Sequence, residues 1–270
     1  MTEAILSIRD LKTHFQTQAA GFLGEKKVIK AVDGVSFDIA PGEVLSLVGE
    51  SGCGKSTVGR TLTHLEKSTA GQALFDGQDI LTLSPAQFRP LRRDIQMIFQ
   101  DPFASLNPRL TIEQTLGEPL FIHGLAKNWA EARVLIAETL DLVGMAPEVM
   151  TRHPHEFSGG QRQRIGIARV MILKPKLVIA DEAVSALDVS IQAQVLNLIK
   201  KLQRDSGISM LFISHDLGVV RHISDRVAVM YQGEIVEMGT KHEIFENPQH
   251  AYTRKLLSAI PRIKTRQVNA

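Results

Sequence analysis

A glycine-rich stretch from Gly49 to Thr57 has the residue types and the spacing that bind phosphate groups. Its residues are Gly49, Glu50, Ser51, Gly52, Cys53, Gly54, Lys55, Ser56 and Thr57, which fit the pattern G-x-x-x-x-G-K-[ST]. Glycines let backbone N–H groups approach an anion, and the start of a following helix favours negative charge. Lys55 is expected to reach the β- and γ-phosphates of a nucleotide, and the Ser56 hydroxyl to help hold Mg²⁺. The alternative is a glycine-rich turn that binds nothing.

Two adjacent carboxylates follow a short apolar stretch later in the chain. Residues 177–180 are apolar and predict a buried strand, and Asp181 and Glu182 come directly after them. At the end of a strand, Asp181 is placed to hold Mg²⁺ through water. Glu182 then suits a general base that acts on an attacking water molecule. The alternative is that this pair only caps a helix.

Two other polar residues also come after strand-like apolar stretches. Gln100 follows residues 95–99 and could contact both the cation and the attacking water, and His215 could hydrogen-bond a γ-phosphate. Taken alone, Gln100 is better explained as a solvated amide before a turn, and His215 as a structural or exposed histidine. His153 and His155 could chelate a metal, but no third ligand is evident.

A second candidate anion site lies at Ser158-Gly159-Gly160-Gln161. These small and polar residues open a predicted helix, 158–173, with Ser158 as its N-cap and Gln161 three residues on. One nucleotide does not need two separate anion-binding helix starts. Two molecules placed face to face do, because each can then offer this site to the γ-phosphate of the other.

The elements that must position these residues predict an α/β fold. Strands that alternate with helices imply a parallel sheet with its ligands at the carboxyl ends of the strands, where each polar group falls. Earlier in the chain, apolar residues that alternate with polar ones predict an antiparallel sheet. From about residue 103 the apolar residues take a helical spacing, which predicts a helical insert. The predicted segments are strands at 5–15, 32–39 and 71–75, a surface loop at 16–30, the helical insert at about 103–156, a helix around 191–202, and one amphipathic helix in the tail from 247.

Composition narrows the class of protein. The chain has 270 residues, a formal charge of +2 and 44% apolar residues, which are ordinary values for a globular chain and give no electrostatic argument for nucleic acid. Cys53 is the single cysteine, so the chain cannot build a disulfide or a cysteine cluster for zinc. Neither a signal peptide nor an apolar stretch of about 18 residues is evident, which indicates a cytosolic protein.

These motifs, in their order, resemble those of the ATP-binding cassette (ABC) ATPases. The resemblance implies an ABC nucleotide-binding domain over 1–245, with a RecA-like parallel-sheet core, an antiparallel β subdomain and an inserted helical subdomain at about 103–156. It also implies roles for each matching segment: the Walker A loop at 49–57, the Q-loop at Gln100, the signature at 158–161, Walker B at 177–181 followed by the catalytic Glu182, the D-loop with Ser185 and Asp188, the switch residue His215, and Phe15 for stacking on adenine.

A narrower resemblance is to the ATPase subunits of dipeptide and oligopeptide importers. Three segments carry it: 100–120, 152–169 and 247–261. It implies a C-terminal extension over 246–270, and a subunit that binds ATP and Mg²⁺ and hydrolyses ATP to drive import. The implied partners are a second, related ABC ATPase, two transmembrane permease subunits and, indirectly, a solute-binding protein. The implied location is the cytoplasmic face of the cell membrane, with no nucleic acid bound.

Two positions of the sequence depart from the pattern of the family. Phe157 replaces the usual leucine before the signature and keeps its apolar character, and Ala183 replaces a proline that would restrict the backbone of Glu182.

Two other classes of ABC protein are alternatives to an importer subunit. A soluble ABC ATPase acting on DNA or ribosomes is one of them, but long coiled-coil insertions and a second cassette are missing. An ABC exporter is the other, although its ATPase is commonly fused to transmembrane spans. The cargo is not given by the sequence.

Overall fold

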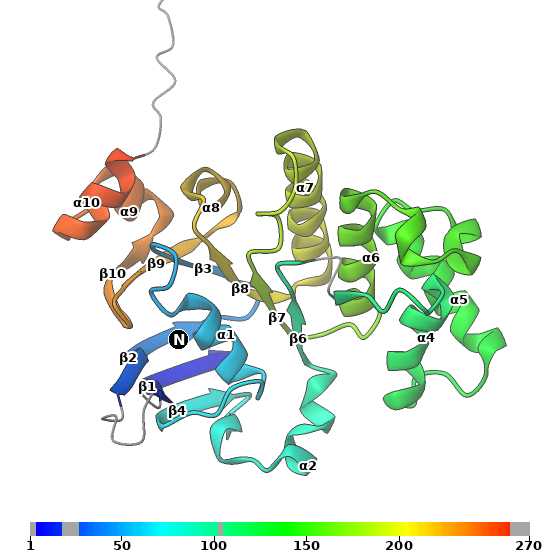
Figure 1. Cartoon of the computed structure of the whole chain (residues 1–270), viewed down its shortest axis with the longest axis horizontal. Helices are drawn as coiled ribbons and strands as arrows, with labels where there is room; N and C mark the ends of the chain where they lie inside the picture. The colour runs from blue at the N-terminus through cyan, green and yellow to red at the C-terminus, as the bar shows by residue number, and fades with distance from the viewer. Residues whose placement is uncertain (1–3, 18–26, 102–104, 260–270) are drawn as a thin grey trace, which may run out of the picture.

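The computed structural model describes residues 4–17, 27–101 and 105–259, and a sheet of six strands lies at its centre (Figure 1). The strand order is β10-β9-β3-β8-β7-β6. Every pair from β9 to β6 is parallel, and β10 pairs antiparallel with β9. The strands are β3 (Val44–Val48), β6 (Ile95–Ile98), β7 (Leu177–Asp181), β8 (Ser209–Ser214), β9 (Arg226–Tyr231) and β10 (Glu234–Thr240).

The central strands are apolar on both sides because both faces of the sheet are covered. All residues of β3, β7 and β8 are buried. Successive side chains point to opposite faces, so Val178 and Ala180 enter one core cluster while Leu177 and Ile179 enter another. This double burial explains why these strands read as continuous apolar stretches in the sequence.

A helix and a second sheet cover one face of the central sheet. Helix α1 (Lys55–Leu62) contributes Val58 and Leu62 to this core. The second sheet has the order β2-β1-β4-β5, and all its pairs are antiparallel. Its strands are β1 (Leu6–Thr17), β2 (Lys27–Ile39), β4 (Ala70–Phe75) and β5 (Gln78–Asp79).

Helices cover the other face and extend to one side of the molecule (Figure 1). The long helix α7 has a left-handed glycine, Gly207, at its C-cap, where a residue with a Cβ would be strained. The helices are α4 (Ile112–Ile122), α5 (Trp129–Leu142), α6 (Gly159–Met171), α7 (Val189–Ser206), α8 (Leu217–Ile223), α9 (Lys241–Glu246) and α10 (Ala251–Ser258), with the short α2 (Pro85–Phe88) and the 3-10 turns η1 (Ile80–Thr82), η2 (Pro90–Arg92), η3 (Pro147–Thr151) and η4 (Pro154–Glu156).

The α/β prediction is confirmed, and several boundaries are corrected. The loop predicted at 16–30 was wrong at both ends, because β1 continues to Thr17 and β2 begins at Lys27. The β1–β2 ladder holds these polar segments through backbone bonds, which hydrophobic spacing does not reveal. Strands β9 and β10 and helix α9 were not predicted. The predicted tail helix corresponds to α10, and the end of the tail, 260–270, lies outside the described residues. The division into domains stays a prediction.

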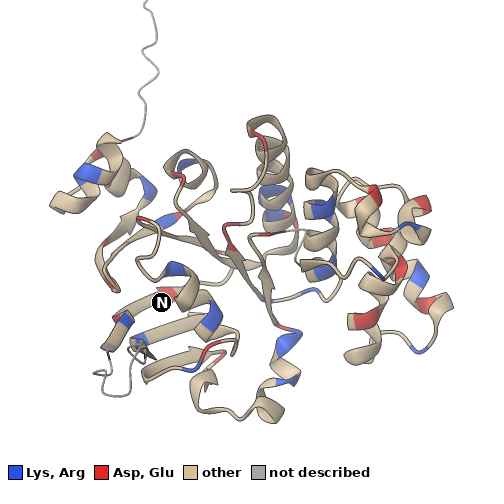
Figure 2. Ribbon diagram, in the orientation of Figure 1, with Lys and Arg blue, Asp and Glu red and all other residues tan. Residues whose placement is uncertain are grey.

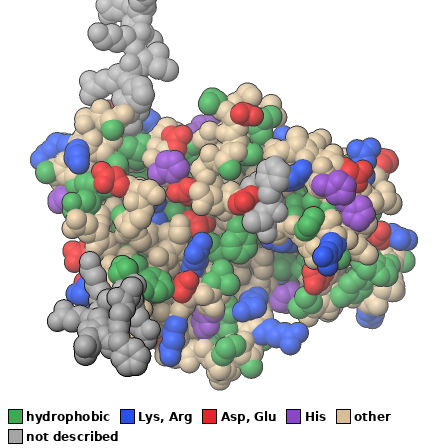
Figure 3. Space-filling view, viewed as in Figure 1, with side chains coloured by type: hydrophobic (Ala, Val, Ile, Leu, Met, Phe, Trp, Pro, Cys, Tyr) green, Lys and Arg blue, Asp and Glu red, His purple; other side chains and the backbone are tan. Residues whose placement is uncertain are grey.

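Charges of both signs are spread over the molecule. Figure 2 shows basic and acidic residues interspersed along the ribbon. In Figure 3, the visible face has acidic, basic and apolar side chains side by side, without one extended area of a single charge. Among the described helices, none combines the length and the apolar character needed to cross a membrane.

Candidate nucleotide-binding site

The sheet register brings the predicted polar residues to one edge. The parallel strands β3, β8, β7 and β6 are neighbours and end level with one another: Val48 pairs with Ser214, Asp181 with Ile213, and Ala180 with Ile98. The chain segments that leave these ends are the 49–57 loop, His215, Glu182 and Gln100. Residues that are far apart in the sequence therefore meet at the carboxyl edge of the sheet, where parallel α/β sheets place their ligands.

Close packing explains two glycines of the 49–57 loop. A Cβ on Gly49 would lie 2.2 Å from the Met230 carbonyl oxygen, and one on Gly54 would lie 1.9 Å from that of Ala31. Gly54 also has a φ of 109°, in the region that favours glycine. Gly52, with a φ of 81°, has nothing within 4 Å of an added Cβ and faces open space. The loop is thus wedged between β2 and β9 on one side and open on the other.

The open side of the loop offers N–H groups and one ammonium group. Gly54 is the N-cap of α1 and has no side chain to cap the first-turn N–H groups, which suits an anion there. Lys55 is 3% exposed, and its Nζ donates to the carbonyl oxygens of Gly49 at 2.8 Å and Glu50 at 2.9 Å. The Cys53 Sγ lies 3.7 Å from the same Nζ. The ammonium group is therefore held beside the loop that would receive phosphate.

Ser56 and Asp181 meet as the Mg²⁺ hypothesis requires. The Ser56 hydroxyl donates to Asp181 Oδ1 at 2.7 Å. Asp181 is 4% exposed, and this burial raises the pKa of its carboxyl group, although the Ser56 hydrogen bond and the nearby Arg60 oppose the rise. A buried carboxylate beside a hydroxyl supplies the kind of oxygen ligands that a hard cation prefers.

In the part of the chain that the structure describes, three or more His, Cys, Asp or Glu side chains nowhere gather as metal ligands. The Mg²⁺ hypothesis for Ser56 and Asp181 therefore depends on further oxygen ligands from water and from phosphate groups.

Glu182 is held by the two other residues predicted to act with it. Gln100 Nε2 donates to Glu182 Oε2 at 2.8 Å, and Nδ1 of His215 lies 3.0 Å from Oε1. Glu182 itself has a φ of 47°, and Ser185 fixes the turn after it by donating both its N–H and its hydroxyl to the Glu182 carbonyl. Both carboxylate oxygens of Glu182 are thus engaged by neighbouring side chains.

The signature segment forms a separate helix start. Ser158 and Gln161 form a capping box at the first turn of α6, in which Ser158 Oγ accepts from the Gln161 N–H and Gln161 Oε1 accepts from the Ser158 N–H. Gly160 packs against α7, since an added Cβ would lie 2.4 Å from Ile191 Cγ2. Among the described residues, no hydrogen bond or ion pair connects the signature to the 49–57 loop.

The remaining predicted residues are placed as follows. Phe15 lies on β1, opposite Ile29 of β2. Ile29 is two residues, or about 7 Å, along β2 from Ala31, whose carbonyl oxygen packs against Gly54 of the loop. Asp188 is the N-cap residue of α7, without a capping hydrogen bond from its side chain. The structure thus brings Ser56, Asp181, Glu182, Gln100 and His215 together and leaves the signature apart. One contact was missed: Tyr252 reaches the loop from α10, a distance in sequence that no motif indicated.

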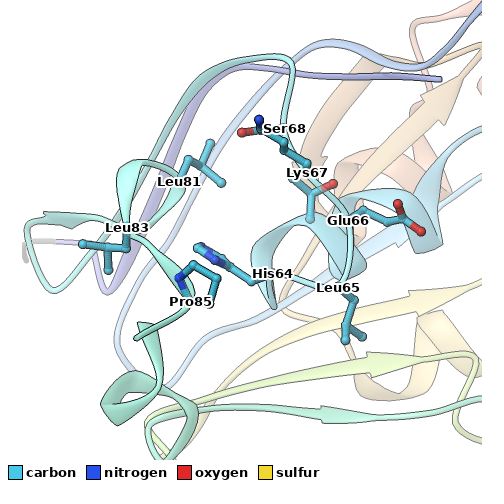
Figure 4. A pocket seen from close by; sticks show the side chains of 9 residues that line it. His64, Leu65, Glu66, Lys67, Ser68, Leu81, Leu83 and Pro85 are labelled. Atoms are coloured by element: carbon cyan, nitrogen blue, oxygen red, sulfur yellow. The ribbon is translucent and has the colours of Figure 1, made fainter. Parts of the chain in front are cut away.

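A pocket of about 390 Å³ lies away from these residues, at the other end of α1 (Figure 4). The segment 64–68 and the residues Leu81, Leu83 and Pro85 line it. The His64 ring stacks on Phe88 at 3.9 Å, and its Nε2–H donates to the Ile80 carbonyl oxygen at 2.6 Å, so the imidazole is used in packing. None of the predicted site residues lines this pocket.

Two family models match the sequence. The ABC transporter model covers residues 32–185, and a model of the oligopeptide/dipeptide transporter C-terminal region covers residues 236–269. The chain is 57% identical over 259 residues to the glutathione import ATP-binding protein GsiA of Salmonella typhimurium (strain LT2) and of Escherichia coli (strain K12). These alignments cover 96% of this chain and 41% of each relative, so the chain spans less than half the length of those relatives.

Solved structures of related sequence share the fold. A dimeric post-hydrolysis state of the ATP-binding cassette MJ0796, bound to ADP and Pi, superposes with a TM-score of 0.77 at 28% identity and covers 87% of this chain and 98% of its own. CbiO1 from Clostridium perfringens, part of the ABC transporter complex cbiONQ, superposes with a TM-score of 0.76 at 27% identity and covers 97% of each chain.

Proposed function

This chain belongs to the ABC transporter family, and from that premise we propose that it binds ATP with Mg²⁺ and hydrolyses it to drive import. The observation that carries the proposal is the common edge of β3, β6, β7 and β8, where a phosphate-binding loop, a buried carboxylate and a held glutamate meet. Each feature alone has a structural explanation, but phosphoryl transfer to water needs all of them in one place.

In the proposed reaction, the loop binds and orients the phosphates. The N–H groups at the start of α1 and the Lys55 ammonium group receive the β- and γ-phosphates, while Ser56 and Asp181 supply oxygen atoms for Mg²⁺. Bound Mg²⁺ neutralises the charge that develops on the phosphates. Phe15 stacks on the adenine ring from β1.

Glu182 acts as the general base in this proposal. Its carboxylate takes a proton from the attacking water, and Gln100 and His215 hold that carboxylate through the two bonds of 2.8 Å and 3.0 Å. Each carboxylate oxygen accepts more than one hydrogen bond, so the attacking water can bind while Gln100 and His215 stay in place. In this proposal His215, with 53% of its side chain accessible, also hydrogen-bonds the γ-phosphate.

We infer that the cargo belongs to the peptide class. The support is the match of residues 236–269 to the oligopeptide/dipeptide transporter model and the identity with glutathione import proteins, glutathione being a small peptide. The proposed partners are a second, related ABC ATPase, two permease subunits and a solute-binding protein. The subunit would then work at the cytoplasmic face of the membrane, where the permease subunits hold it.

Hydrolysis is tested by phosphate release from Mg²⁺-ATP. We expect the wild-type chain to hydrolyse ATP and Glu182→Gln to be slower by about 10² to 10⁴, because the amide cannot take the proton. Glu138→Gln, the same change at an exposed position of α5, is the matched control and should leave the rate unchanged. Wild-type activity in Glu182→Gln would contradict the assignment of the base.

Import is tested by uptake of labelled solutes in cells that lack this gene. We expect the loss of uptake of a dipeptide, a longer peptide or glutathione, restored by the wild-type gene and not by Glu182→Gln. Unchanged uptake of all three, with loss of another solute, would refute the peptide class while leaving ATP hydrolysis intact.

A further inference from the structure

A tyrosine from the C-terminal helix α10 reaches Glu50, the second residue of the phosphate-binding loop. The Glu50 backbone N–H donates to the Tyr252 hydroxyl at 3.0 Å, across 202 positions of sequence. Tyr252 lies in α10 and is 7% exposed. Its ring is 4.3 Å from that of Tyr231, and it shares a core cluster with Val48, the last residue of β3 before the loop. The tyrosine is therefore fixed at the entrance to the loop.

The Glu50 peptide group is a junction for the loop. The Glu50 N–H, which Tyr252 uses, lies in the peptide group that joins Gly49 to Glu50, and the Gly49 carbonyl oxygen of the same group accepts from Lys55 Nζ at 2.8 Å. A change in the position of this peptide group therefore moves the ammonium group that would meet the phosphates. Burial raises the pKa of the Tyr252 phenol, so its hydroxyl stays neutral at ordinary pH and can accept the bond.

The start of helix α10 is anchored to β10 by hydrogen bonds to one carboxylate. The Glu237 carboxylate of β10 accepts the N–H groups of Gln249 at 2.7 Å and His250 at 3.0 Å, just before the helix begins. Burial alone would raise the pKa of Glu237, but these backbone donors help to lower it, so the carboxylate stays charged and holds the helix start. Figure 1 shows α9 and α10 beside β9 and β10.

We propose that Tyr252 is a positioning residue for ATP binding: its hydroxyl fixes the Glu50 peptide group so that the loop is ready for phosphate before the nucleotide arrives. This inference rests on the proposed function. In this proposal the C-terminal segment sets the fraction of molecules whose phosphate-binding loop is in the conformation that binds ATP. An affinity that depends on a preformed state falls with the population of that state.

The test compares two changes from tyrosine to phenylalanine, one in each of two neighbouring rings. Titration of the full chain with a fluorescent ATP analogue should give a dissociation constant about threefold to tenfold higher for Tyr252→Phe, as expected for one neutral hydrogen bond. Tyr231→Phe is the matched control and should bind like the wild type. Lys255→Met removes the exposed 3.9 Å ion pair with the Glu50 side chain and should also bind like the wild type.

Two further readings separate positioning from stability. Amide hydrogen exchange at Glu50 should be faster in Tyr252→Phe, and KM for ATP should rise with kcat unchanged. A wild-type dissociation constant in Tyr252→Phe, with or without a lower Tm, would overturn the inference and leave the proposed function standing. No ATP binding by the wild-type chain would overturn the proposed function, and the inference with it.

Discussion

At the scale of single residues, the environment of Asp181 connects stability with cation binding. Its carboxyl group is buried at the end of β7, and burial raises its pKa in the folded chain. An acid with a raised folded pKa favours folding below its ordinary pKa of about 4, and that contribution is lost as the pH rises through the folded value. At neutral pH the charged carboxylate is thus a cost to the nucleotide-free protein, which a cation can relieve.

We predict that Asp181→Asn raises the Tm of the nucleotide-free chain at pH 7.5 and raises it less near pH 4. Asparagine keeps an oxygen for the Ser56 hydroxyl and removes the buried charge. Thermal unfolding at both pH values measures the effect. Asp141→Asn, at an exposed position near the end of α5, serves as control and should show no such dependence on pH. A lower Tm for Asp181→Asn at pH 7.5 would show that the charge is compensated within the fold.

The sequence motifs predicted the main residues of the site, but they did not predict the contact that Tyr252 of α10 makes with the loop. Gln100, Asp181, Glu182 and His215 could be found because each follows a buried strand, and parallel strands end at a common edge. Tyr252 could not, because a bond between a side chain and a backbone N–H has no spacing rule across 202 positions. The roles of the motif residues themselves stay predictions until the variants are measured.

At the scale of elements, two of the three glycines of α6 have opposite surroundings. Gly160 meets Ile191 at the start of α7, whereas a Cβ on Gly166 would have nothing within 4 Å. The close approach at Gly160 brings the signature helix against the segment that follows the D-loop. Packing thus requires glycine at position 160, whereas no neighbouring atom requires it at position 166.

We predict opposite effects of alanine at these two positions of α6. Gly166→Ala should raise the free energy of unfolding by about 0.5 to 1 kcal/mol, because alanine favours helix. Gly160→Ala should lower it by about 1 to 2 kcal/mol, since overpacking against Ile191 outweighs the same helix preference. Urea unfolding measures both. Equal stabilisation of the two variants would mean that Ile191 moves aside without cost.

The strength of the local signal explains which elements could be predicted. Strands β3, β7 and β8 are buried on both faces and read as continuous apolar stretches. The start of β2, from Lys27, has polar and half-exposed residues and is held by its ladder with β1, so it read as loop. The short β5, η1 and α2 owe their form to turns and caps, such as the Ser84–Gln87 capping box, rather than to hydrophobic spacing.

At the scale of the whole molecule, the chain has two helix N-termini that suit anions, and these two N-termini are not in contact with each other. The loop at the start of α1 and the capping box at the start of α6 have no bond between them among the described residues. We assign them to the two sides of one nucleotide, in a pair of cassettes that closes on two ATP molecules. ATP then favours the closed pair because only that form completes the γ-phosphate contacts.

Light scattering of Glu182→Gln with Mg²⁺-ATP, alone and mixed with the partner ATPase, tests this composite site most directly. Slow hydrolysis should trap the closed pair, so we expect the molar mass to double when ATP is added. Adding Ser158→Arg should abolish that doubling, because a bulky side chain fills the signature. Ser206→Arg, at the exposed far end of α7, should leave it intact. An ATP-dependent dimer that persists with Ser158→Arg would contradict the account.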